Sequence, residues 1–104
     1  MPPAKLKEYA LDPDHEEGKN KARVFASALG IRQDDWEYLA EQIMAGLESA
    51  PVIGVRTDGP WGWLYEVRIQ IDGLNGQTHP VTTVWFCEAG TEPPRLTTAY
   101  VAVP

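Results

Sequence analysis

The chain has 104 residues, of which 43% are hydrophobic and 23% charged, and its formal net charge at pH 7 is −6. These ordinary values exclude a disordered chain and favour a single domain with one core over residues 1–104. No apolar run reaches the roughly 20 residues of a transmembrane helix, and Met1 to Lys7 has no signal-peptide core, which predicts a cytoplasmic protein.

The sequence indicates neither thiol nor metal chemistry. The single cysteine, Cys87, cannot form an internal disulfide and lies in an apolar segment, which favours a packed thiol over a nucleophile. Two histidines and one cysteine at wide spacing match no zinc-binding pattern. We therefore expect neither a metal nor another cofactor.

Helical patterns fill the first half of the chain. Pro13 disfavours helix at the residue before it, so a turn is expected at Asp12-Pro13-Asp14. From Lys19 to Leu29 apolar residues recur with helical spacing, and Gly30 follows as a C-terminal stop. The first helix is therefore predicted over residues 19–29.

A second helix is predicted over residues 35–48. Asp34 and Glu37 have the spacing of a capping box, in which Asp34 accepts hydrogen bonds from the first free backbone N–H groups. The acidic residues lie mostly on the face opposite an apolar stripe, which consists of Trp36, Leu39, Ala40, Ile43 and Leu47. Ser49-Ala50-Pro51 ends the pattern.

After Pro51 the apolar period changes from helical to alternating, which predicts strands. The expected strands are Val52 to Thr57, Trp63 to Ile71, Val81 to Glu88 and Arg95 to Val103, and the turns between them are Asp58 to Gly62, Asp72 to Gln77 and Ala89 to Pro94. Short connections imply antiparallel neighbours. The predicted fold class is α+β, with two N-terminal helices (about 1–50) packed on a four-stranded antiparallel meander (about 51–104). Its expected core residues are Phe25, Leu29, Trp36, Leu39, Ile43, Val67 and Ile69.

Charge is unevenly distributed along the chain. Residues 33–50 have five acidic and no basic side chains, whereas residues 1–32 have six basic and five acidic side chains. Affinity for phosphate backbones comes largely from Lys and Arg, so only the N-terminal third offers a modest cationic site. A solvated charged face is the alternative reading.

Two stretches carry a resemblance to a known family. The first comprises Tyr9 to His15, Gly18, Lys21-Ala22, Phe25 and Leu29-Gly30, and the second comprises Asp72-Gly73, Asn75-Gly76, Val81, Thr83, Trp85, Pro94 to Leu96 and Thr98 to Tyr100. Together they resemble a family of small bacterial domains of unknown function, numbered 6883. That family in turn resembles the barnase, EndoU, colicin D and RelE-like ribonuclease toxins. The resemblance implies a toxin-type ribonuclease acting on RNA, commonly tRNA, with a cognate inhibitor or immunity protein as partner.

Metal-free RNA cleavage, by attack of the 2′-hydroxyl to give a 2′,3′-cyclic phosphate, needs a base, an acid and a cation. His15 titrates near neutrality and is the candidate acid or base, although a turn or capping role is the alternative. Lys21 is the candidate cation, with ordinary helix surface as its alternative. Arg95 can hold a phosphate through two parallel donors, and Thr98 can donate to a phosphate oxygen.

Four further residues are candidates for substrate binding. Lys19 lies near a helix start, where backbone N–H groups also attract anions. Alternation places Thr83 with Trp85 and Thr98 with Tyr100, so the two pairs are expected to form one patch in which Trp85 and Tyr100 stack on bases. The alternative is that Trp85 and Tyr100 are core aromatics.

A second class of function is also compatible with the sequence. The acidic second helix would suit a non-catalytic module, such as an inhibitor or a partner-binding subunit, that faces a basic protein. The enzyme hypothesis requires His15 and the strand from Arg95 to Tyr100 to meet in one cleft. If they lie on opposite sides of the domain, that hypothesis fails.

Overall fold

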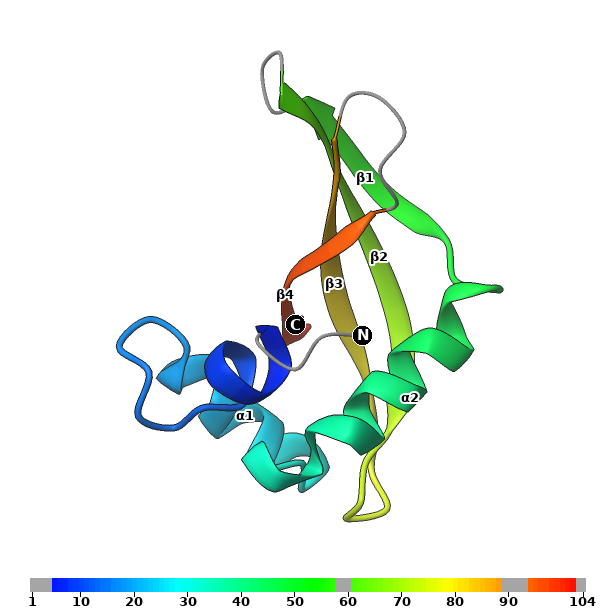
Figure 1. Ribbon diagram of the computed structural model, residues 1–104. Helices are drawn as coiled ribbons and strands as arrows, with labels where there is room; N and C mark the ends of the chain where they lie inside the picture. The colour runs from blue at the N-terminus through cyan, green and yellow to red at the C-terminus, as the bar shows by residue number, and fades with distance from the viewer. Residues whose placement is uncertain (1–4, 58–60, 89–93, 103–104) are drawn as a thin grey trace.

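The computed structural model describes residues 5–57, 61–88 and 94–102, in which helical elements precede one four-stranded sheet (Figure 1). The elements are η1 (Leu6–Ala10), α1 (Lys19–Leu29), η2 (Gln33–Asp35), α2 (Trp36–Leu47), β1 (Val52–Thr57), β2 (Gly62–Asp72), β3 (Thr78–Glu88) and β4 (Arg95–Val101). The strands are antiparallel neighbours in the order β1-β2-β3-β4. The predicted α+β class and meander are confirmed. Val103 and much of the two turns predicted around residues 58–62 and 89–94 lie outside the described residues.

Helix α1 has the predicted limits, and its end is tied to the sheet. Gly30 adopts φ 66°, a left-handed conformation that favours glycine, and its N–H donates to the Ala26 carbonyl. The turn between β2 and β3 lies against this helix end, where the Asn75 side-chain amide donates to the Ala28 carbonyl at 3.2 Å. The hairpin thereby satisfies a carbonyl that the helix leaves free and fixes α1 relative to the sheet.

Two helical features differ from prediction. The capping box at Asp34 is wrong, because the carboxylate that reaches back is that of Asp35, whose Oδ2 accepts from the Arg32 N–H at 3.0 Å. A tight turn, η2, therefore precedes α2. The helical turn η1 was not predicted, since five residues are too few for a periodic signal. It buries Leu6 and Ala10 in the core.

The strand register divides the sheet into two faces. Residues on one face pack under the helices, and this covered face consists of Val67, Ile69, Ile71, Val81, Thr83, Trp85, Leu96, Ala99 and Val101. Alternation puts the intervening side chains on the other side of the sheet. This open face consists of Arg56, Glu66, Arg68, Gln70, Thr82, Val84, Phe86, Arg95, Thr98 and Tyr100.

The core follows the predicted stripes. Phe25, Leu29, Leu39 and Ile43 are fully buried. The strand residues Val67 and Ile69 are also buried, and Trp36 is partly buried against the same cluster. Figure 1 shows α1 beside the end of β4 and α2 along β2, so the two helices cover different strands of the same face.

Gly46 allows α2 to approach β2 closely. A methyl group at this position would overlap the Cγ2 atom of Ile69. Gly46→Ala normally favours a helix by about 1 kcal/mol, but here we expect a net loss of about 1 to 3 kcal/mol in the free energy of unfolding, because the core would be overpacked. Urea denaturation measures this change. As a control, Ala45→Ser on the exposed side of α2 should stay within about 0.5 kcal/mol of the parent. A Gly46→Ala protein more stable than the parent would contradict the close packing.

Candidate functional site

His15 lies in the turn before α1 and holds that turn together. Its Nδ1 atom accepts hydrogen bonds from the backbone N–H groups of Glu17, at 3.1 Å, and Gly18, at 3.0 Å. With Nδ1 acting as an acceptor, the neutral ring carries its proton on Nε2. A histidine that acts as an acid or base passes through the imidazolium form, in which Nδ1 also carries a proton. Protonation of Nδ1 would break both hydrogen bonds from the backbone. The geometry therefore favours the turn alternative over an acid or base role.

Lys21 and Tyr9 form a close polar pair next to His15. The Lys21 ammonium donates to the Tyr9 hydroxyl at 2.6 Å and lies 4.6 Å from the centre of the Tyr9 ring. The His15 ring packs edge-on against the same tyrosine, with centroids 4.8 Å apart. Tyr9 thus links the two residues that the sequence suggested, and it holds the ammonium group of Lys21 in place.

Lys21 and Tyr100 come together at the edge of the sheet. They line a shallow hollow of about 320 Å³ between α1 and β4, together with Asn20, Val24 and Val101. Of the four proposed catalytic residues, only Lys21 lines this hollow. His15 is linked to it through Tyr9 rather than by lining it.

Thr98 and Arg95 lie on the open face of β4, in line with Tyr100. In the register, Tyr100 is opposite Thr82, Thr98 is opposite Val84 and Arg95 is opposite Phe86. At about 3.3 Å per residue, Arg95 is on the order of 15 Å from Tyr100 along the strand. The four predicted catalytic residues are therefore not gathered in one phosphate-sized cleft, but three of them follow one edge of the molecule.

Side chains on this edge have unused hydrogen-bonding capacity. The Oγ1 atoms of Thr82 and Thr98 are shielded from solvent and have no hydrogen-bond partner within the described residues. An unsatisfied buried hydroxyl costs about 1 to 3 kcal/mol. Thr98 as a whole is half-buried. The Arg95 guanidinium is exposed and lies 5.9 Å from the centre of the Phe86 ring, which orients it by a cation–π contact.

The predicted patch of Thr83, Trp85, Thr98 and Tyr100 is wrong. Thr83 and Trp85 point to the covered face, whereas Thr98 and Tyr100 point to the open face. Thr83 is fully buried and donates to the Val67 carbonyl at 2.8 Å, while the Trp85 indole N–H donates to the Thr83 hydroxyl at 2.8 Å. These two residues form a satisfied polar pair in the core, and Trp85 lines an apolar hollow on the covered face, away from Thr98 and Tyr100.

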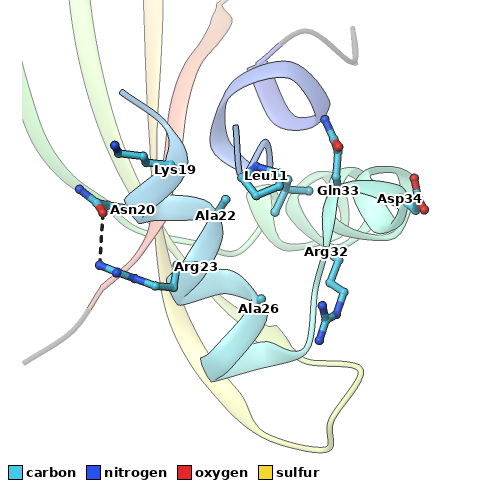
Figure 2. Close-up of a pocket in the computed structure, with 10 residues that line it drawn as sticks. Leu11, Lys19, Asn20, Ala22, Arg23, Ala26, Arg32, Gln33 and Asp34 are labelled. Atoms are coloured by element: carbon cyan, nitrogen blue, oxygen red, sulfur yellow. Dashed lines mark hydrogen bonds between the residues drawn. The ribbon is translucent and has the colours of Figure 1, made fainter. Parts of the chain in front are cut away.

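Lys19 belongs to a different hollow, on the other flank of α1. This cationic cavity has a volume of about 710 Å³ and lies between α1 and the segment that leads to α2 (Figure 2). Lys19 and Arg23 line it from the helix, and Arg32 lines it from the following segment. Asn20 lines both this cavity and the Lys21 hollow. The basic residues of α1 are thus divided between two sites.

Sequence reasoning missed Tyr9, Arg23 and Arg32 as candidate site residues. The Arg23 signal was present, because Lys19 and Arg23 are four residues apart and share a helix face. Tyr9 had no such signal, since it meets Lys21 only after the turn at residues 12–18 folds the chain back. Arg32 likewise joins the cavity only through tertiary structure.

The turn contacts of His15 give a stability prediction. His15→Ala leaves two N–H groups without their acceptor and should lower the free energy of unfolding by about 0.5 to 2 kcal/mol. His15→Asn should stay close to the parent, because the asparagine Oδ1 lies near the position of Nδ1 and accepts the same bonds. Urea denaturation of the three proteins tests this. Equal losses in both variants would show that the acceptor atom is not what matters at this position.

Among residues 5–57, 61–88 and 94–102, no cluster of three or more His, Cys, Asp or Glu side chains is arranged to hold a metal ion. In the same part of the chain, no helix has both the length and the apolar character needed to cross a membrane.

Two helices on one face of a four-stranded antiparallel meander, with cations at the edge of the other face, define a small α+β domain with a candidate anion-binding surface. The chain belongs to the family described as a domain of unknown function (DUF6883), whose model matches residues 1–103. No curated protein matches the chain, and no solved structure does. The family part of the sequence resemblance is confirmed, while its ribonuclease part stays a prediction.

Proposed function

We propose that this protein is a metal-independent endoribonuclease of the toxin type that cleaves RNA, with tRNA as the first candidate substrate. The observation that carries the proposal is a strip of polar side chains along β4. This β4 strip consists of Lys21, Tyr100, Thr98 and Arg95. It provides a cation from α1 at the sheet edge and, from β4, a hydroxyl, an aromatic ring and a bidentate phosphate donor, which are the kinds of groups that bind single-stranded RNA.

Each residue of the β4 strip has a role in the proposed cleavage reaction. The 2′-oxygen attacks phosphorus and the bond from phosphorus to the 5′-oxygen breaks, which leaves a 2′,3′-cyclic phosphate and a 5′-hydroxyl. Lys21 stabilises the charge that develops on the phosphate. The Lys21 ammonium, which donates to the Tyr9 hydroxyl at 2.6 Å, gives a proton to the leaving 5′-oxygen as general acid, and the proton of the 2′-hydroxyl passes to solvent water.

The other residues of the proposal bind or position. Thr98 donates to a phosphate oxygen, and Tyr100 stacks on a base beside the Lys21 hollow. Arg95, further along the strand, holds a neighbouring phosphate through two parallel N–H donors. His15 acts as a positioning residue, since it holds the turn before α1 and packs against Tyr9.

The acidity of the chain does not fall on this strip. The acidic segment, residues 33–50, contains α2, which packs on the covered face of β2 through Gly46. Tyr100, Thr98 and Arg95 lie on the open face of β4, with β3 between β4 and β2, and Lys21 lies on α1 beside the edge strand β4. The β4 side chains and the acidic helix are therefore on opposite faces of the sheet, and screening by salt further weakens their repulsion.

The experiment that tests the proposal is incubation of the purified protein with total tRNA in EDTA at low salt. We expect discrete fragments whose 3′ ends carry a 2′,3′-cyclic phosphate. His15→Asn should retain cleavage within about tenfold, whereas a general acid or base would lose about a hundredfold or more. Absence of cleavage across many RNAs would overturn the proposal in favour of the non-catalytic, acidic protein-binding module.

A further inference from the structure

We infer that the apolar hollow beside β1 binds a positively charged segment of another protein, which adds to the outer edge of β1 as a further strand. The hollow has a volume of about 400 Å³ and lies on the covered face of the sheet, next to the end of α2. Met44 and Leu47 line it from α2, Val52 lines it from β1, and Tyr65 and Trp85 line it from β2 and β3. None of these residues belongs to the β4 strip, so the inference does not depend on RNA cleavage.

Exposed apolar side chains gather around this hollow. Figure 1 shows α1 and α2 over the end of the sheet at which β2 turns into β3, and neither of them covers the other end. Within the described residues seven large apolar side chains are exposed, and six of them lie on α2, on β1 or at the start of β2. These six are Met44, Val52, Ile53, Val55, Trp61 and Trp63. Such a concentration of exposed apolar side chains is typical of a protein-binding surface.

The free edge of β1 gives the form in which a partner binds. β1 is the outermost strand on its side, and no described strand pairs with its outer edge. Unpaired N–H and C=O groups on such an edge are a template for a strand from another chain. The register places Val52 opposite Val67 and Val55 opposite Tyr65, so both valines point to the face that holds the hollow. Every second side chain of an added strand would lie beside these valines.

The charge beside the hollow gives the sign of the partner. Glu37, Glu41, Met44 and Glu48 are spaced by four, three and four residues, so they follow one exposed stripe of α2 and its last turn. Because Met44 lines the hollow, the flanking Glu41 and Glu48 border it. Residues 33–50 contain no Lys or Arg, and within the described residues none of the three glutamates is in an ion pair. Lysine or arginine side chains of a partner would therefore meet carboxylates that have no competing cation.

The same charge argues against a second copy of this chain. Two copies joined through β1 would place two acidic stripes on one continuous sheet, and each copy has a net charge of −6. RNA is disfavoured at this surface for the same reason. A basic segment with alternating apolar side chains satisfies the edge, the hollow and the glutamates together.

Calorimetric titration with three synthetic peptides of about eight residues tests the inference. The first alternates Lys and Leu, the second alternates Glu and Leu, and the third alternates Lys and Ser. We expect the Lys/Leu peptide to bind at least about tenfold more tightly than either of the others, because it alone combines positive charge with apolar side chains.

Backbone methylation tests the strand itself. Successive N–H groups of a strand point to opposite edges, so the Lys/Leu peptide is N-methylated either at its lysines or at its leucines. Only the methylation on the edge that faces β1 should weaken binding, by about tenfold or more.

Met44→Gln tests the hollow, since it removes an apolar side chain and keeps a good helix former. It should weaken binding of the Lys/Leu peptide by about tenfold, as expected for the loss of one buried apolar side chain. Leu74→Gln is the matched control, because Leu74 is exposed to the same 52% but lies in the turn between β2 and β3. It should bind as the parent does. Both positions are exposed, so thermal denaturation should show unchanged folding.

The double variant Glu41→Gln with Glu48→Gln tests the acidic stripe. It should weaken binding of the Lys/Leu peptide by about tenfold or more at low salt. Glu16→Gln with Glu17→Gln changes the net charge equally, but at exposed positions before α1, and should leave the affinity unchanged.

Several results would overturn the inference. These are no binding of the Lys/Leu peptide at millimolar concentration, equal affinity for all three peptides, equal effects of the two methylations, or unchanged affinity in Met44→Gln and in the double variant of the stripe. Sedimentation of the protein alone tests the remaining occupant. A dimer at micromolar concentration that Met44→Gln dissociates would assign the surface to a second copy and also overturn the inference.

Discussion

Lys21→Met is expected to lower the rate of RNA cleavage by about a hundredfold or more, because one preorganised group that stabilises the transition-state charge contributes roughly that much. Methionine keeps most of the side-chain length beside Tyr9 and Val24 but removes the ammonium group. The fold should therefore be preserved. The measurement is the initial rate of fragment formation from tRNA in EDTA, at several salt concentrations.

The control for this variant is Lys7→Met, which removes an exposed lysine outside the β4 strip. Both variants change the net charge equally, so a difference between them reports the position of the charge rather than its amount. Comparable rates for parent, Lys21→Met and Lys7→Met would remove Lys21 from the mechanism. A second contact can be tested by Arg95→Lys, which keeps the charge but loses the planar bidentate donor.

Phe25→Ala is expected to lower the free energy of unfolding by about 3 to 5 kcal/mol. Phe25 is fully buried on α1 and belongs to the core cluster beneath both helices. A domain of this size has a total stability on the order of 5 to 15 kcal/mol, so the variant should approach the limit of folding. Urea denaturation followed by circular dichroism gives the change.

Ser27→Ala provides the comparison for this loss. Ser27 lies two residues further along α1 and is exposed, so its truncation should change stability by less than about 0.5 kcal/mol. If Phe25→Ala were equally mild, the stripe of residues 22, 25 and 29 would not be the packed face of the helix.

The limits of α1 and the order of the strands depended on local chemistry, which is why they were predictable. The apolar spacing of residues 19–29 and the stop at Gly30 require only the geometry of one helix. The start of α2 was placed less well, because two adjacent aspartates compete for the same role and only Asp35 reaches the free N–H of Arg32. The start of β3 was also placed less well, since the strand begins at Thr78 rather than at Val81.

The candidate site was less predictable, because it depends on contacts between distant segments. Alternation correctly grouped Thr83 with Trp85 and Thr98 with Tyr100, since each pair is two residues apart on one strand. Alternation could not predict that the two pairs lie on opposite faces of the sheet. That depends on the register between β3 and β4, which includes an irregularity between Val84 and Trp85, and a shift of one residue moves every side chain to the other face.

By itself the sequence determined the α+β class, the order of the elements, both main helices and most of the buried apolar residues, because these follow from periodicity and turn residues along the chain. Only the tertiary structure decided that Lys21 binds Tyr9 and lines a hollow with Tyr100, and that Arg32 lines the same cavity as Lys19 and Arg23. The physical reason is that ring orientation, strand register and the packing of α1 against β4 bring together groups 12 to 80 residues apart, as with Lys21 and Tyr9 at one extreme and Lys21 and Val101 at the other. No local sequence pattern predicts contacts between residues so far apart in the chain.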